Sequence, residues 1–128
     1  MNTSNKKLIL LVDDEIAVLK LLDFILKKDY QLVVHHNGLS AISWMDQGNM
    51  PDLIISDLEM PYVDGLDFVR SLKTSGYYRN IPIILLSAAY SLEELTDKLP
   101  YTYDLLMPKP FNPDHLKEQI IRLLNLSL

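Results

Sequence analysis

Five short apolar runs alternate with longer stretches of helical period along this chain. The runs are rich in β-branched residues and read KLILLV (7–12), QLVVH (31–35), DLIIS (52–56), IPIILLS (81–87) and DLLM (104–107). Alternation of this kind is typical of βα units around a parallel sheet. Three of the runs are almost wholly apolar, as expected of strands that helices cover on both faces. The sequence therefore predicts an α/β fold, a doubly wound five-stranded parallel sheet with helices on both faces.

The helices are expected near 15–28, 38–47, 65–74, 91–99 and 113–125. Asn112-Pro113 provides an N-cap followed by proline at the first helical position, and Leu116, Ile120 and Leu124 then recur on one face. No linker or shift in composition divides the 128 residues, a length typical of one domain. We therefore expect a single domain over residues 1–128, with no effector domain within it.

The composition argues against several classes of function. The net charge is −5 and no basic stripe is present, so direct binding of nucleic acid is not expected. The absence of cysteine excludes a disulfide framework, a thiolate metal site and a thiol nucleophile. The apolar run after Lys6 and Lys7 is shorter than the ~7–15 residues of a signal peptide core or the ~20 that cross a bilayer. We expect a soluble, cytoplasmic protein without membrane insertion.

Residues whose side chains can bind a metal ion or take part in a reaction come directly after the apolar runs. They are Asp13, Asp14 and Glu15 after the first run, Asp57 and Glu59 after the third, Ser87 at the end of the fourth and Lys109 after the fifth. In open parallel sheets, ligands bind outside the carboxyl ends of the strands. Acids at a helix start commonly serve only the helix dipole. Several acids in one pocket, however, cannot all stay ionised without a cation, and all-oxygen ligands suit Mg²⁺.

A metal beside Asp57 would suit a carboxylate that accepts a phosphoryl group. Such a transfer requires that metal and cationic donors neutralise the charge on the transferring oxygens. Lys109 and the hydroxyl of Ser87 are donors of the right kind, and both are expected at strand ends facing the same pocket.

The motifs LVDDE, SDLEMPYVDGLDF, LLSA and PKPF, in that order, resemble the receiver domain of two-component response regulators. The resemblance extends from Lys7 to about Leu124. It implies the flavodoxin-like strand order 2-1-3-4-5, in which the fifth strand is at an edge, where Pro108 is tolerated. It also implies a signalling protein rather than an enzyme, one that catalyses only its own phosphorylation and dephosphorylation.

The resemblance further implies a metal site and a phosphoryl donor. Asp57 would accept a phosphoryl group from a histidine of a sensor histidine kinase or a phosphotransfer protein. Asp14 and Asp57 would bind Mg²⁺ directly, together with the backbone carbonyl of Glu59. Asp13 would act through a metal-bound water. The downstream effector is not specified by the sequence.

Two further site residues take their roles from the resemblance. Ser87 would move to bond the phosphoryl oxygen, and Lys109 would pair with the acyl phosphate. Lys109-Pro110 resembles the cis peptide of the family, which would aim the lysine. Leu106 stands where the family usually has an aromatic residue, and Thr102-Tyr103 replaces a customary Gly-Ala. These departures concern how the signal is passed on and not the phosphoacceptor.

The segment IAVLKLLDFILKK (16–28) has more apolar residues than one core-facing stripe can hold. In the resembling family a kinase or phosphotransfer helix docks on the first helix, so we expect the surplus to form a docking surface; the alternative is apolar residues scattered over the surface. His35, His36 and His115 are not spaced as metal ligands and are expected at the surface.

Two alternatives stay open at this point. One is a pseudo-receiver, a binding or dimerisation module that keeps the fold without the chemistry. The other is a Mg²⁺-dependent aspartyl-phosphate hydrolase of the haloacid dehalogenase type, whose nucleophile would be the first acid of a D-x-D motif. Asp13 and Glu15 have that spacing, but the hydroxyl expected shortly after them is missing.

Overall fold

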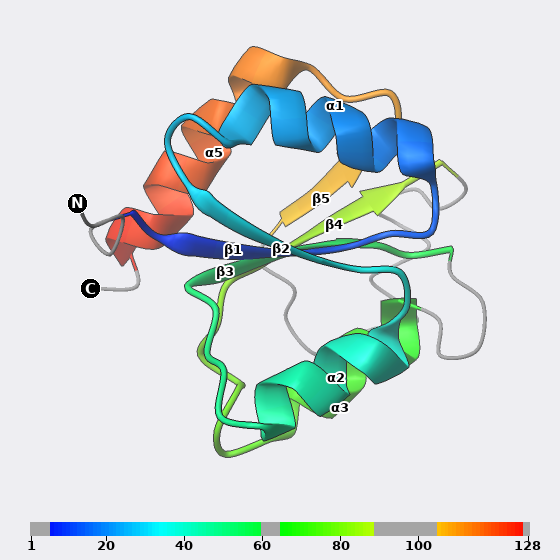
Figure 1. Ribbon diagram of the computed structural model, residues 1–128, viewed down its shortest axis with the longest axis vertical. Coiled ribbons are helices and arrows are strands. Elements are labelled where there is room, and N and C mark those ends of the chain that lie inside the picture. The colour runs from blue at the N-terminus through cyan, green and yellow to red at the C-terminus, as the bar shows by residue number, and fades with distance from the viewer. Residues whose placement is uncertain (1–5, 60–64, 89–104, 127–128) are drawn as a thin grey trace.

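A computed structural model of the chain describes residues 6–59, 65–88 and 105–126 (Figure 1). The strands are β1 (Leu8–Val12), β2 (Gln31–His35), β3 (Leu53–Asp57), β4 (Ile83–Ser87) and β5 (Leu105–Pro108). The helices are α1 (Ile16–Leu26), α2 (Gly38–Asp46), α3 (Gly65–Lys73) and α5 (Pro113–Leu126). These elements confirm the predicted ones, with ends that differ by at most two residues. The helix predicted over 91–99 lies outside the described residues.

The five strands form one parallel sheet in the order β2-β1-β3-β4-β5. This order confirms the one that the resemblance implied. β1 and β3 are neighbours, so the acids that follow them meet at the same edge of the sheet. β5 is an edge strand, and Pro108, which has no N–H to donate, is its last residue, opposite Ser87.

Helices cover both faces of the sheet, as predicted (Figure 1). α1 and α5 lie on one face and share an apolar cluster with Ile9 and Leu11 of β1. α2 and α3 lie on the other face, around Leu10 and Val12. All residues of β3 and β4 are buried. This two-sided burial accounts for the unbroken apolar runs in the sequence.

The last helix begins and packs as its sequence predicts. Oδ1 of Asn112 accepts a hydrogen bond from the N–H of His115 at 3.1 Å, which caps α5. Leu116 and Ile120 are fully buried, and Leu124 is partly buried against the same cluster. Within the described residues, none of the helices combines the length and apolar character that crossing a membrane requires.

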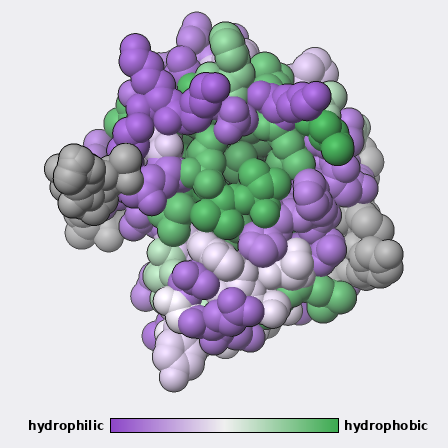
Figure 2. Space-filling view, viewed as in Figure 1, coloured by the Kyte–Doolittle hydropathy of each residue, from purple (hydrophilic) through white to green (hydrophobic). Residues whose placement is uncertain are grey.

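The edge strand β2 is less covered than the central strands. Leu32 and Val33 are half-buried, and Val34 is 41% exposed. Figure 2 shows an apolar area where Figure 1 places β2, with hydrophilic residues around it.

His35 corrects one of the sequence-based expectations, because it is half-buried rather than at the surface. Its Nδ1 lies 3.0 Å from Oγ of Ser40, and its ring centroid lies 5.7 Å from that of Trp44. Burial, together with the charge of nearby His36, lowers the pKa of His35. Both neighbours belong to α2, a contact between elements that a single-sequence pattern does not show.

Candidate functional site

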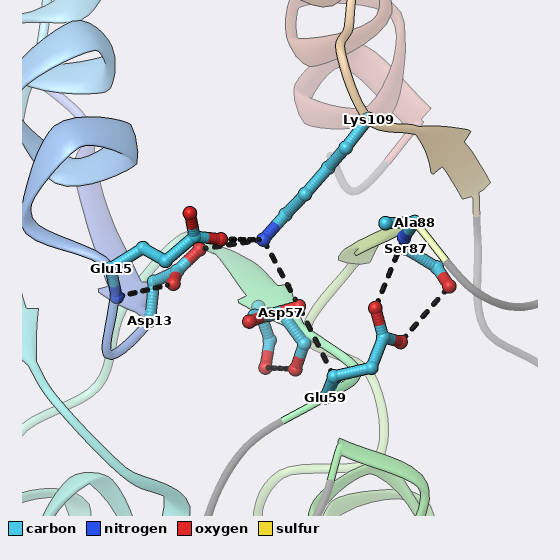
Figure 3. Close-up of polar contacts among 8 residues, drawn as sticks. Asp13, Glu15, Asp57, Glu59, Ser87, Ala88 and Lys109 are labelled. Atoms are coloured by element: carbon cyan, nitrogen blue, oxygen red, sulfur yellow. Dashed lines mark hydrogen bonds and ion pairs between the residues drawn. The ribbon is translucent and has the colours of Figure 1, made fainter.

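Four strand ends bring the predicted site residues together at the carboxyl edge of the sheet (Figure 3). Asp57 is the last residue of β3, and Asp13 follows the neighbouring strand β1. Ser87 ends β4, and Lys109 follows β5. The N–H of Asp13 donates to the carbonyl of His35, and the N–H of Lys109 donates to that of Ser87 at 2.9 Å. These backbone bonds fix where each side chain leaves the sheet.

Three carboxylates converge at this edge. Asp13, Asp14 and Asp57 each offer one carboxylate oxygen, and these oxygens all lie within 4.8 Å of one another. Asp13 and Asp57 are buried, with 1% and 2% exposure, whereas Asp14 is exposed. Oδ1 of Asp13 also accepts a hydrogen bond from the N–H of Glu15 at 2.9 Å, just before α1. The structure therefore brings together the acids that the sequence places after two different strands.

Lys109 provides the cation among these acids. Its Nζ lies 3.0 Å from Oε1 of Glu15, 3.2 Å from Oδ1 of Asp57 and 3.5 Å from Oδ2 of Asp13. The side chain is only 13% exposed, so these ion pairs are partly shielded from solvent. The Lys109-Pro110 peptide bond is cis, as the resemblance implied. Sequence reasoning placed Glu15 at this edge but did not foresee its contact with Lys109.

Burial and neighbouring charges shift the pKa values of these groups. Burial, together with the charge of Asp13, raises the pKa of Asp57 to about 6, although Lys109 and the N–H of Glu59 oppose the rise. Burial also raises the pKa of Asp13. For Lys109, burial disfavours the charged form, but the hydrogen bond to Glu15 and the charges of Asp13 and Asp57 outweigh it and raise the pKa of the ammonium group. The two buried acids therefore need more positive charge than the lysine alone supplies.

Oδ2 of Asp13 has the ammonium group of Lys109 at 3.5 Å but makes no hydrogen bond within the described residues. The atom is buried and has no hydrogen-bond partner within residues 6–59, 65–88 and 105–126. Leaving a buried carboxylate oxygen without a hydrogen bond is costly. Carboxylate oxygens from three side chains are the donors that Mg²⁺ prefers, and an exposed Asp14 leaves room for the waters that Mg²⁺ retains. The residues present therefore fit a hydrated divalent cation.

Glu59 links the ends of β3 and β4. Its N–H donates to Oδ1 of Asp57 at 3.2 Å. Its carboxylate accepts a hydrogen bond from Oγ of Ser87 and another from the N–H of Ala88, both at 3.0 Å (Figure 3). Sequence reasoning assigned a role to the backbone carbonyl of Glu59 and missed the side chain. These partners are 28 and 29 residues away, so no local pattern could have indicated them.

α1 has a buried face and an exposed apolar face, as its composition predicted. Leu22 is 1% exposed in the core, whereas Ile16, Leu21 and Phe24 are 61%, 42% and 79% exposed. Part of this helix borders a groove of about 340 Å³ next to the acidic site. The groove is lined by Glu15, Val18, Leu21, Ala88, Lys109, Pro110 and Phe111.

Comparison with known proteins assigns this arrangement to a family. Residues 9–121 match the family model of the response regulator receiver domain. The response regulator Rre1 of Synechocystis is 32% identical over 116 residues, which are 89% of this chain and 49% of Rre1. The chain spans about half the length of the curated response regulators that it matches.

Solved structures show the same fold. The signal receiver domain of a signal transduction histidine kinase from Syntrophus aciditrophicus has a TM-score of 0.85 and 33% identity, over 93% of this chain and 90% of the other. The receiver domain of the sensor histidine kinase PA1611 from Pseudomonas aeruginosa has a TM-score of 0.83 and 23% identity, over 94% and 98%. Nothing in these comparisons favours a pseudo-receiver. Fold, motif order and family match agree, and the chain belongs to the receiver domains of two-component response regulators.

Proposed function

We propose that Asp57 is the phosphoacceptor of this receiver domain. A phosphohistidine of a sensor histidine kinase or phosphotransfer protein is the donor. The P–N bond breaks with its electrons staying on the histidine nitrogen, and a P–O bond to a carboxylate oxygen of Asp57 forms. The observation that carries the proposal is the position of Asp57, whose buried carboxylate lies 3.2 Å from Nζ of Lys109 and within a cluster of three acids.

Asp14 and Asp57 would hold Mg²⁺ directly together with the backbone carbonyl of Glu59, and Asp13 would hold it through a water. When bound, the ion supplies positive charge that offsets the carboxylates and the oxygens of the transferring phosphoryl group. The carboxylate cluster and the buried Oδ2 of Asp13, which has no hydrogen bond within the described residues, support this site. The PA1611 receiver domain has been solved with a magnesium ion coordinated in its active-site cleft.

Lys109 and Ser87 would stabilise the phosphorylated form. Lys109 already pairs with Asp57 and is placed to stay with the acyl phosphate. Ser87 ends β4, the neighbour of the strand that ends in Asp57, so its hydroxyl can donate to a phosphoryl oxygen. The domain would catalyse only its own phosphorylation and dephosphorylation, the second by attack of water on phosphorus, which breaks the P–O bond to Asp57 and releases inorganic phosphate.

The donor protein would dock on the exposed apolar face of α1. This helix begins three residues after Asp13, so a partner seated on Ile16 and Leu21 lies next to the acidic site. The groove beside α1 is also lined by Lys109, whose Nζ lies 3.2 Å from Oδ1 of Asp57. A single domain over residues 1–128 and a cytoplasmic location stay predictions from the sequence.

The test is intact-mass spectrometry after incubation with Mg²⁺ and acetyl phosphate. We expect an adduct of about 80 Da, one phosphoryl group, that requires Mg²⁺ and is absent in Asp57→Asn. Asp114→Asn, which changes an exposed acid at the start of α5, is the matched control and should label like the unmodified chain. Undiminished labelling of Asp57→Asn would show that another residue accepts the group.

A further inference from the structure

The side chain of Glu59 holds the two residues that the phosphorylated site would need to move. Its Oε2 accepts a hydrogen bond from Oγ of Ser87, and its Oε1 accepts one from the N–H of Ala88, each at 3.0 Å (Figure 3). One carboxylate thereby fixes both the end of β4 and the first residue after it. The backbone N–H of Glu59 is itself anchored on Oδ1 of Asp57 at 3.2 Å.

These contacts compete with the role proposed for Ser87. A serine hydroxyl has a single proton to donate. While the Ser87 O–H donates its hydrogen bond to Oε2 of Glu59, it is not available to an oxygen of a phosphoryl group on Asp57. The second bond, to Ala88, holds the backbone at the point where the chain would shift with Ser87. Exchange of one acceptor for the other is therefore a two-state step.

We propose that Glu59 is a positioning residue that latches Ser87 and Ala88 in the unphosphorylated arrangement. The inference rests on the proposed function of Asp57 and adds a regulator of that same site. Some ligands bind only when Ser87 and Ala88 are released from Glu59. The apparent affinity of such a ligand is its intrinsic affinity multiplied by the fraction of molecules in the released arrangement. The length and charge of the side chain at position 59 thus set how readily the domain responds.

A simpler effect of charge has to be separated from the latch. Glu59 is exposed and anionic, so its removal also lessens repulsion of any anionic phosphodonor. Glu59→Asp keeps the charge but is one methylene shorter and no longer reaches both Ser87 and Ala88. Glu59→Ala removes both charge and contacts. Neither change alters the backbone carbonyl proposed as a metal ligand.

The test measures binding of beryllofluoride, a mimic of the phosphoryl group, by calorimetry in the presence of Mg²⁺. Loss of one or both hydrogen bonds, at roughly 1 kcal/mol each, predicts that Glu59→Asp and Glu59→Ala bind it about five- to thirtyfold more tightly than the unmodified chain. Titration with Mg²⁺ alone measures the metal affinity of each variant separately, so that beryllofluoride binding is compared at saturating Mg²⁺. A purely structural role would lower the denaturation midpoint without tightening the binding of beryllofluoride.

Each outcome has a defined meaning. Tighter binding by both variants supports the latch. Tighter binding by Glu59→Ala alone overturns it in favour of charge repulsion, and unchanged or weaker binding by Glu59→Asp overturns it as well. Failure of the proposed function has a different signature: the unmodified chain would not bind beryllofluoride, or Asp57→Asn would bind it equally well.

Discussion

Nζ of Lys109 lies 3.2 Å from Oδ1 of Asp57, and the two side chains are only 13% and 3% exposed. The pKa of Asp57 is raised by burial, and that of Lys109 is raised by its acidic neighbours. Lys109 opposes the rise in the pKa of Asp57, and Glu15, Asp13 and Asp57 together stabilise the ammonium group. Removing one member of such a pair leaves an uncompensated buried charge, which is usually more harmful than losing the pair together. The behaviour of single variants follows from this relationship.

Lys109→Met should lower the free energy of unfolding by about 3 kcal/mol at neutral pH without metal, because Asp13 and Asp57 lose their shared cation. Added Mg²⁺ should restore part of that loss, since a divalent cation replaces the missing charge. Urea denaturation with and without Mg²⁺ measures both effects. Lys117→Met, on the exposed face of α5, is the control and should change stability by less than about 0.5 kcal/mol. Equal stabilities of the two variants would contradict this account of Lys109.

Asp57 should make the metal-free protein less stable as the pH rises. Its pKa is raised from 3.8 to about 6 in the folded state, so between these values the folded chain keeps a proton that the unfolded chain releases. The free energy of unfolding then falls as pH increases from about 4 to about 6, by up to about 3 kcal/mol. Asp57→Asn cannot ionise and should be the more stable protein at pH 7 but not at pH 4. Urea denaturation in EDTA across this range decides it, and identical pH profiles would rule the effect out.

Asp14→Ala should weaken Mg²⁺ binding more than Asp13→Ala does. A direct ligand contributes more to affinity than a residue that acts through a bound water. The structure gives the two acids different surroundings, since Asp14 is exposed while Asp13 is buried and also accepts the N–H of Glu15. Isothermal titration calorimetry with Mg²⁺ gives both affinities, and circular dichroism checks that Asp13→Ala still folds. Equal losses would refute this division of roles.

The two faces of α1 should respond differently to truncation. Leu22 is 1% exposed within the core, so Leu22→Ala should cost about 2–4 kcal/mol of unfolding free energy. Phe24 is 79% exposed on the same helix, and Phe24→Ala should change stability by less than about 0.5 kcal/mol. Chemical denaturation of the pair measures the contrast. A large cost for Phe24→Ala would mean that this ring belongs to the core and not to a docking surface.

The sequence predicted the elements well because strands covered on both faces must be apolar throughout. β3 and β4 illustrate this, since all their residues are buried. The position of the site followed from the same reasoning, because parallel strands end at one edge and Asp13 and Asp57 follow neighbouring strands. The order of the strands came from the family resemblance, because an apolar run does not specify which strand lies beside it.

Contacts that depend on the conformation of individual side chains could not be predicted from the sequence. Glu59 accepts hydrogen bonds from Ser87 and Ala88, and Glu15 pairs with Lys109 at a separation of 94 residues. Both acids are exposed, so the pattern of buried residues does not indicate their partners. His35 was predicted at the surface but is half-buried, because its neighbours Ser40 and Trp44 belong to another element, α2.

Phosphorylation should move the end of β4 more than it moves β5. On the proposed mechanism, Ser87 and Ala88 would exchange the carboxylate of Glu59 for the phosphoryl group, which would change their hydrogen bonds directly. Leu106 is half-buried against the α2 and α3 cluster and has no aromatic ring to present at the surface. Its inward and outward rotamers should therefore present nearly the same surface to a partner protein. A strong output signal would then come from Tyr90, Tyr101 or Tyr103, which lie outside the described residues.

Amide NMR shifts with and without beryllofluoride and Mg²⁺ test this expectation. Large changes should centre on residues 87–90, with modest ones over 104–107, and Asp57→Asn should show neither. The contrast follows from geometry, because β4 ends beside Asp57 whereas β5 reaches the site only through Lys109. Large shifts over 104–107 with none at 87–90 would mean that Leu106 transmits the signal as the usual aromatic residue does.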